Sequence, residues 1–64
     1  MSIQDMRLIR LLAEKIGIKT VDELNQFKKI TKAHTNEALL KRLALFVASG
    51  ITFKEARQHE RLFN

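Results

Sequence analysis

Apolar residues recur at helical spacing along nearly the whole chain, and this periodicity limits the fold more than any other feature of the sequence. Proline is absent and glycine occurs only twice, at Gly17 and Gly50, so few residues interrupt the pattern. Nowhere do β-branched and polar residues alternate as they would in a half-buried strand. We therefore predict an all-α fold: a compact bundle of four short helices joined by tight corners capped by Gly and Thr, forming one domain over residues 1–64.

Two similar segments mark the predicted corners. Gly17-Ile18 and Gly50-Ile51 each pair a glycine with an apolar residue, which is typical of a helix C-terminus. Thr20 and Thr52 follow, each with a glutamate three residues later, and this spacing predicts a capping box that starts a new helix. Weak helix formers around His34 predict the third break, with Thr35 or Asn36 as cap. We expect helices at about residues 3–16, 21–32, 36–49 and 53–63.

The spacing also predicts which side chains face inward. Helix 36–49 is apolar almost all round, which is typical of a central, buried helix, with Leu43 and Val47 at the middle of its arc. Leu45 projects on the polar side of the same helix. Ser2 is the expected N-cap of the first helix. In the other helices, the residues expected inward are Met6, Ile9, Leu12, Ala13, Ile16, Val21, Leu24, Phe27, Thr31, Phe53, Ala56, His59, Leu62 and Phe63.

The sequence offers no equipment for catalysis or for metal binding. There is no Cys, no Gly-rich phosphate loop, and neither His34 nor His59 neighbours a matching Ser or Asp pattern. We expect no enzyme activity, no cofactor and no metal site, and we expect His59 to be half-buried with one nitrogen satisfied. No apolar run is long enough to span a membrane, and the first residues lack the pattern of a signal peptide. A cytoplasmic protein without a membrane partner is therefore expected.

The charge balance favours an acidic partner. The chain carries 12 Lys and Arg against 7 Asp and Glu, a net charge of +5. Such a basic chain is suited to double-stranded DNA or to an acidic partner protein.

One corner resembles a known DNA-binding motif. The segment Leu12 to Ile18 is similar to the first helix and turn of helix-turn-helix DNA-binding proteins, in which a small Ala precedes the turn Gly by four residues, as Ala13 precedes Gly17 here. The apolar position expected six residues after the Gly is Glu23 in this chain. At the second corner Phe46 stands where the Ala is expected, but Ala56 follows Gly50 at the right distance. The resemblance implies a DNA-binding regulator that is dimeric and reads the major groove.

Two groups of basic residues are candidate DNA contacts. Lys54, Arg57, Gln58 and Arg61 lie at positions i, i+3, i+4 and i+7 of the last predicted helix, with no acid among them. Arg and Gln read guanine and adenine edges, and Lys holds phosphates. A second group flanks the break around His34 and comprises Lys28, Lys29, Lys32, Lys41 and Arg42.

Two functional hypotheses follow from these patterns. The first is a small DNA-binding regulatory protein of helix-turn-helix type, of the kind that mobile elements encode. The alternative is a small helical protein-interaction module, an adaptor or an inhibitor of a partner protein, with Leu45 and Leu11 as candidate interface residues and a homodimer as one possible assembly.

Overall fold

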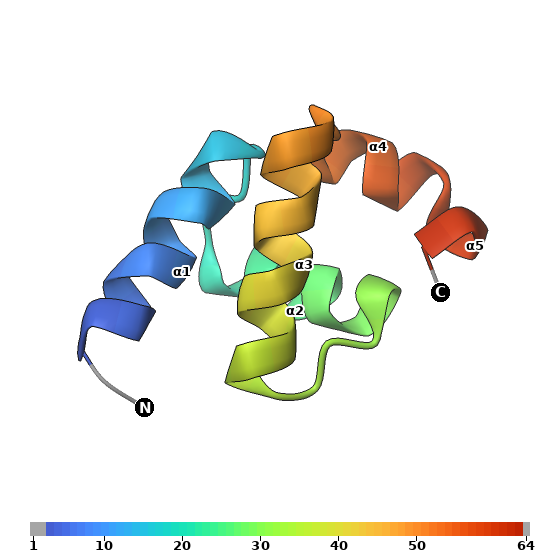
Figure 1. Cartoon of the computed structure of the whole chain (residues 1–64). Helices are drawn as coiled ribbons and strands as arrows, with labels where there is room; N and C mark the ends of the chain where they lie inside the picture. The colour runs from blue at the N-terminus through green and yellow to red at the C-terminus, as the bar shows by residue number, and fades with distance from the viewer. Residues whose placement is uncertain (1–2, 64) are drawn as a thin grey trace.

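The computed structural model describes residues 3–63, and each regular element in that range is a helix. The helices are α1 (Ile3–Lys15), α2 (Val21–Thr31), α3 (Asn36–Ser49), α4 (Phe53–Gln58) and α5 (Glu60–Phe63). Figure 1 shows α3 in the middle, between α1 on one side and the α4–α5 arm on the other. α1 packs along α3, and α2 packs against α4 and α5. The all-α prediction is confirmed, with five helices in place of four, while the cap expected at Ser2 lies outside the described residues.

Three corners of the same kind end the three long helices. Gly17, Lys32 and Gly50 adopt left-handed backbone conformations, with φ of 91°, 56° and 69°. The next residue then donates its backbone N–H to a carbonyl in the last turn of the helix, which is the Schellman pattern. These bonds are Ile18 to Ala13 (2.9 Å), Ala33 to Lys28 (3.0 Å) and Ile51 to Phe46 (3.0 Å). The sequence predicted the two glycine corners, but not a left-handed lysine at the third.

A threonine starts each helix that follows a corner. The hydroxyl oxygens of Thr20, Thr35 and Thr52 accept the backbone N–H of Glu23, Ala38 and Glu55, at 3.1, 3.0 and 3.3 Å. At Thr20 and Thr52 the glutamate side chain also accepts the threonine N–H, so both predicted capping boxes are confirmed. Such caps satisfy N–H groups that have no partner inside the helix.

One backbone hydrogen bond joins the first corner to the last. The N–H of Phe53, the first residue of α4, donates to the carbonyl of Ile16 at 2.8 Å. A first-turn N–H has no acceptor in its own helix, so this bond holds the start of α4 against the end of α1.

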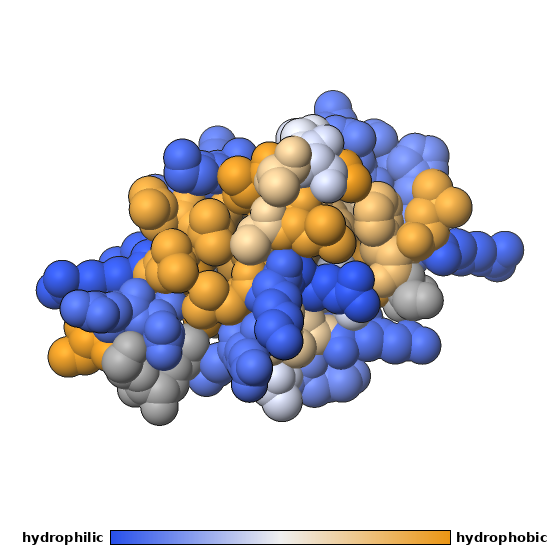
Figure 2. All heavy atoms as spheres, viewed as in Figure 1, coloured by the Kyte–Doolittle hydropathy of each residue, from blue (hydrophilic) through white to orange (hydrophobic). Residues whose placement is uncertain are grey.

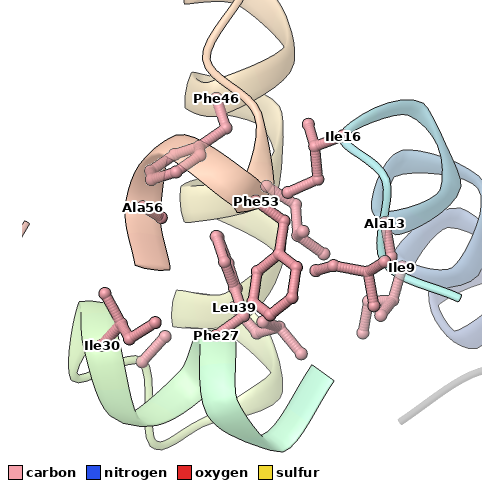
Figure 3. Close-up of a cluster of buried hydrophobic side chains, with 12 residues drawn as sticks. Ile9, Ala13, Ile16, Phe27, Ile30, Leu39, Phe46, Phe53 and Ala56 are labelled. Atoms are coloured by element: carbon pink, nitrogen blue, oxygen red, sulfur yellow. The ribbon is translucent and has the colours of Figure 1, made fainter. Parts of the chain in front are cut away.

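The core lies where the helices meet around three aromatic rings. Phe27 and Leu43 are fully buried, and the ring of Phe46 meets that of Phe27 edge-on, with 4.9 Å between centroids. Figure 3 shows the labelled side chains converging from α1, α2, α3 and α4. The expectation that the phenylalanines are core residues is confirmed for Phe27, Phe46 and Phe53, while Phe63 is half-buried.

The predicted helix 53–63 is interrupted at His59. His59 has φ −131° and ψ 49°, outside the helical region, so α4 ends at Gln58 and α5 begins at Glu60. A straight helix would carry Phe63 about 15 Å from Phe53 along its axis. The break instead allows the Phe63 ring to lie 5.1 Å from that of Phe46. The prediction of a half-buried His59 is wrong, because this residue is exposed at the bend.

Several residues expected inward are exposed. Met6, Val21 and Leu62 are 61%, 74% and 77% exposed. Met6 and Val21 border a hollow between α1 and α2, which do not pack closely, and Leu62 lies on the four-residue α5. Val47 is half-buried rather than buried, and although α3 is central, Ala44 and Ala48 are exposed, so its apolar residues are not covered all round as predicted. Leu45 is exposed, as predicted.

The burial of Leu43 predicts a large stability cost on truncation. Leu43→Ala should lower the free energy of unfolding by about 2–5 kcal/mol, because it removes buried methyl groups and leaves a cavity. Urea denaturation followed by circular dichroism measures this. Leu45→Ala is the matched control on the same helix and should stay within about 0.5 kcal/mol of the parent, because its side chain is exposed. Equal losses for the two variants would contradict the arrangement of α3.

The left-handed lysine predicts a stabilising substitution. Lys32→Gly should raise the free energy of unfolding by about 0.5–1 kcal/mol, because glycine adopts positive φ without steric cost. The Lys32 side chain is exposed, so no packing is lost. Gly50→Ala tests the reverse and should cost about 1 kcal/mol from backbone strain alone, since nothing lies within 4 Å of an added Cβ. A loss of stability in Lys32→Gly would contradict this account of the third corner.

Candidate interaction surfaces

An apolar surface covers one face of the molecule. Figure 2 shows apolar side chains gathered over α1, across α3 and towards α5. On α3 the buried side is followed by half-buried Leu40 and Val47, and then by exposed Ala44 and Ala48. The apolar residues of α3 therefore extend around the helix beyond the side that packs in the core.

A groove between α1 and α3 forms part of this face. It encloses about 570 Å³ and is lined by Asp5, Asn36, Glu37, Leu40, Lys41 and Ala44. Leu8 and Leu12 follow Asp5 by three and seven residues, which places them on the same side of α1. Leu8 is exposed and Leu12 is half-buried. An ion pair between Glu37 and Lys41, at 3.7 Å, lies on the α3 side of the groove.

A second groove lies between α3 and α5. It encloses about 390 Å³ and is lined by Thr31, Arg42, Leu45, Phe46, Ser49, Ile51, Leu62 and Phe63. Leu45 and Leu62 therefore line the same hollow, and both are more than half exposed. Leu11 on α1 is exposed to the same degree as Leu45. The two predicted interface residues are thus open to a partner.

A third groove, larger than the first two, separates α1 from α2. It encloses about 830 Å³ and is lined by Met6, Ile9, Arg10, Ala13, Glu14, Ile18, Lys19, Thr20, Val21, Leu24, Lys28, Asn36 and Leu39. Buried core residues form its floor, and exposed Met6 and Val21 stand on its α1 and α2 walls. We call this hollow the α1–α2 groove.

The basic face predicted on the last helix is divided by the break at His59. Lys54, Arg57 and Gln58 are exposed on α4, whereas Arg61 is exposed on α5, so the expectation of four residues along one helix is wrong. Arg57, Gln58 and Arg61 still line one hollow of about 450 Å³. Glu60 lines the same hollow, so an acid does fall among these residues. The Arg57 guanidinium also lies 5.5 Å from the ring centroid of Phe53.

The second predicted basic group is distributed over several surfaces. Lys28 is half-buried in the α1–α2 groove, Lys41 lines the α1–α3 groove and Arg42 lines the α3–α5 groove. Lys29 and Lys32 are exposed. The structure therefore places Lys28, Lys41 and Arg42 in three different hollows and does not gather the five side chains at one site.

Among residues 3–63, no three His, Asp or Glu side chains lie close enough together to hold a metal ion. No helix in that range combines the length and the hydropathy that crossing a bilayer requires.

Comparison with known proteins assigns no family to the chain. No protein-family model, no curated protein and no solved structure matches it.

Sequence reasoning missed the α1–α2 groove. The sequence does show that Met6 and Val21 each stand at the start of an apolar stripe on a helix, and this could have pointed to an apolar hollow there. The pattern shows which face of a helix is apolar, but not where a neighbouring helix stops covering it.

Proposed function

We propose that this protein is a small helical protein-interaction module that binds another protein through the apolar face over α1, α3 and α5. The observation that supports this most is the exposure of large leucines on those three helices: Leu8, Leu11, Leu45 and Leu62 are 41%, 52%, 52% and 77% exposed. Scattered single leucines are ordinary on a protein surface, but a contiguous apolar area marks an interaction site. Figure 2 shows the apolar atoms of this face as one continuous region.

Covering this face releases free energy that the isolated chain cannot obtain. Burial of apolar surface contributes about 25 cal/mol per Å², or roughly 1–2 kcal/mol for each half-exposed leucine that a partner covers. In the described chain α1, α2, α4 and α5 already pack on the core, so no further helix covers the open side of α3. A second molecule can supply this cover.

The edges of the face have the polar character of an interface rim. Asp5, Asn36, Glu37 and Lys41 border the α1–α3 groove, and Arg42 borders the α3–α5 groove. An apolar centre with a polar rim is the usual anatomy of a protein–protein interface.

Charge substitution on the apolar face should abolish partner binding without unfolding the protein. Leu11→Glu and Leu45→Glu each place a carboxylate where the partner would bury a leucine, so each should weaken binding at least about tenfold. The measurement is capture of partners from a nuclease-treated lysate, at low and at high salt. Captured protein should persist at high salt, because apolar contacts are not screened.

The control variant is Gln26→Glu, an exposed position on α2 outside the three grooves. It adds the same charge and should leave capture unchanged. Sedimentation of the three variants and the parent shows whether the partner is a second copy. Capture that disappears with nuclease, or that is equal for Leu45→Glu and the parent, would contradict the proposal.

DNA binding is the second candidate function. The supporting observation is that Arg57, Gln58 and Arg61 share one exposed hollow in a chain of net charge +5. DNA binding is the weaker of the two candidate functions, because α4 is short and Glu60 lies in the same hollow as these basic residues.

If DNA is bound there, alanine variants should separate base from phosphate contacts. Arg57→Ala or Arg61→Ala should cost about 1–3 kcal/mol of specific binding, whereas Lys54→Ala should reduce the salt dependence by about one unit of slope. Titration of a labelled random duplex at ~50 mM salt is the first measurement. Alanine substitution of Lys28, Lys29 and Lys32 tests in the same way whether the second basic group contacts DNA. Absence of a mobility shift at tens of micromolar protein would contradict DNA binding.

A further inference from the structure

We infer that the α1–α2 groove binds an acidic amphipathic helix of a partner protein. The inference rests on the proposed function in one respect, that the molecule binds proteins, and it adds a second surface with a partner of defined chemistry. The groove lies on the side of α1 that carries Met6 and Arg10, away from Leu8 and Leu11.

The groove is built to accept apolar side chains. Its floor is the outer surface of the core, with Ile9, Ala13 and Leu39 each less than a tenth exposed. Met6 and Val21 stand above this floor with most of their surface open to solvent. Apolar side chains entering between them would remove these two residues and their own surface from water at once.

The length of the groove suits a helix. Its α1 wall runs from Met6 to Glu14, about 12 Å at 1.5 Å per residue, and this is a little over two helical turns. Side chains at i, i+3 or i+4, and i+7 of a docked helix fall within that length. The walls are themselves helices, with their backbone groups already hydrogen-bonded, so an extended segment would find no sheet edge to pair with. A helix brings its own backbone hydrogen bonds.

The charges around the groove select an acidic partner. Arg10, Lys19 and Lys28 line it against Glu14, which leaves +3 − 1 = +2 at its edges. Within residues 3–63 none of these three cations forms a salt bridge. Carboxylates flanking the apolar stripe of a docked helix would therefore meet unpaired cations.

The same charges disfavour a second copy of this chain. The longest exposed apolar stripes lie on α1 and α3, and each of these helices carries more cations than acids, because Arg7, Arg10, Lys15, Lys41 and Arg42 stand against Asp5, Glu14 and Glu37. A copy docked into the groove would set cations against Arg10, Lys19 and Lys28, and like charges across an interface suppress association.

A matched pair of synthetic peptides tests the inference directly. Each peptide has about 18 residues, or five helical turns, with leucines along one face; one carries Glu beside the stripe and the other carries Lys. Binding is followed by the backbone amide shifts of the labelled protein. We expect the Glu peptide to bind at least tenfold more tightly than the Lys peptide, and to shift the amides of Met6, Arg10, Val21 and Lys28.

Val21→Glu is the decisive variant. Val21 is exposed in the first turn of α2, where a carboxylate is favourable for the helix, so the variant should remain folded. It should lose at least tenfold in affinity for the Glu peptide, whereas Val21→Ile should keep it. Joint replacement of Arg10 and Lys28 by Glu should reverse the preference towards the Lys peptide.

Leu45→Glu separates this inference from the proposed function, because Leu45 lies on the other surface. It should lose the proteins whose capture depends on the apolar face, and it should retain its affinity for the Glu peptide. Equal affinity for the two peptides, absence of binding, shifts confined to the α3–α5 groove, or an unaffected Val21→Glu would overturn the inference, whatever happens in the capture experiment. Self-association that Val21→Glu abolishes would overturn it in favour of a second copy.

Discussion

The hydrogen bond that closes the end of each long helix determines the path of the chain, and the rest of the structure depends on it. After α1, α2 and α3, a residue just past the helix (Ile18, Ala33 or Ile51) donates its N–H to a carbonyl in the last turn. This bond requires a left-handed residue between them, at Gly17, Lys32 and Gly50. It also directs an apolar side chain inward, so that Ile18 and Ala33 are buried. A chain of this length reverses direction three times with little loop, and most of its residues remain available for helices.

The corners bring the helices together, but the core they enclose covers only part of each apolar stripe. A domain of about 60 residues buries a smaller share of its surface than a larger one does. Here Phe27, Leu43 and Phe46 occupy the centre, and α3 is left open on the side away from them. The apolar face over α1 and α3 and the α1–α2 groove are two consequences of one limit, which is that five short helices cannot cover each other on all sides.

The sequence predicted the features that depend on local chemistry. The capping boxes at Thr20 and Thr52 and the glycine corners follow from residue types at fixed spacing, and the structure contains them. The left-handed conformation of Lys32 was not predicted, because lysine has no intrinsic preference for positive φ and adopts it here only in the context of the folded chain. The break at His59 accompanies the contact between Phe63 and Phe46, and local spacing does not predict a contact between residues so far apart in the sequence. The exposure of Leu11 and Leu45 could be predicted from helical spacing. The position of a groove could not, because it depends on the angle between two helices.

The basic character and the apolar surfaces of this chain fit a single mode of action. A net charge of +5 suits nucleic acid or an acidic protein, and five of the cations, Arg10, Lys19, Lys28, Lys41 and Arg42, line the grooves beside α1 and α3. Charges in such positions steer an oppositely charged protein and orient it, while the apolar contact supplies most of the affinity. Phosphate binding needs cations that converge on one track, with no acid between them. Around the α1–α2 groove the cations instead flank an apolar floor, an arrangement that matches a helix with carboxylates beside its leucines better than it matches a phosphate backbone.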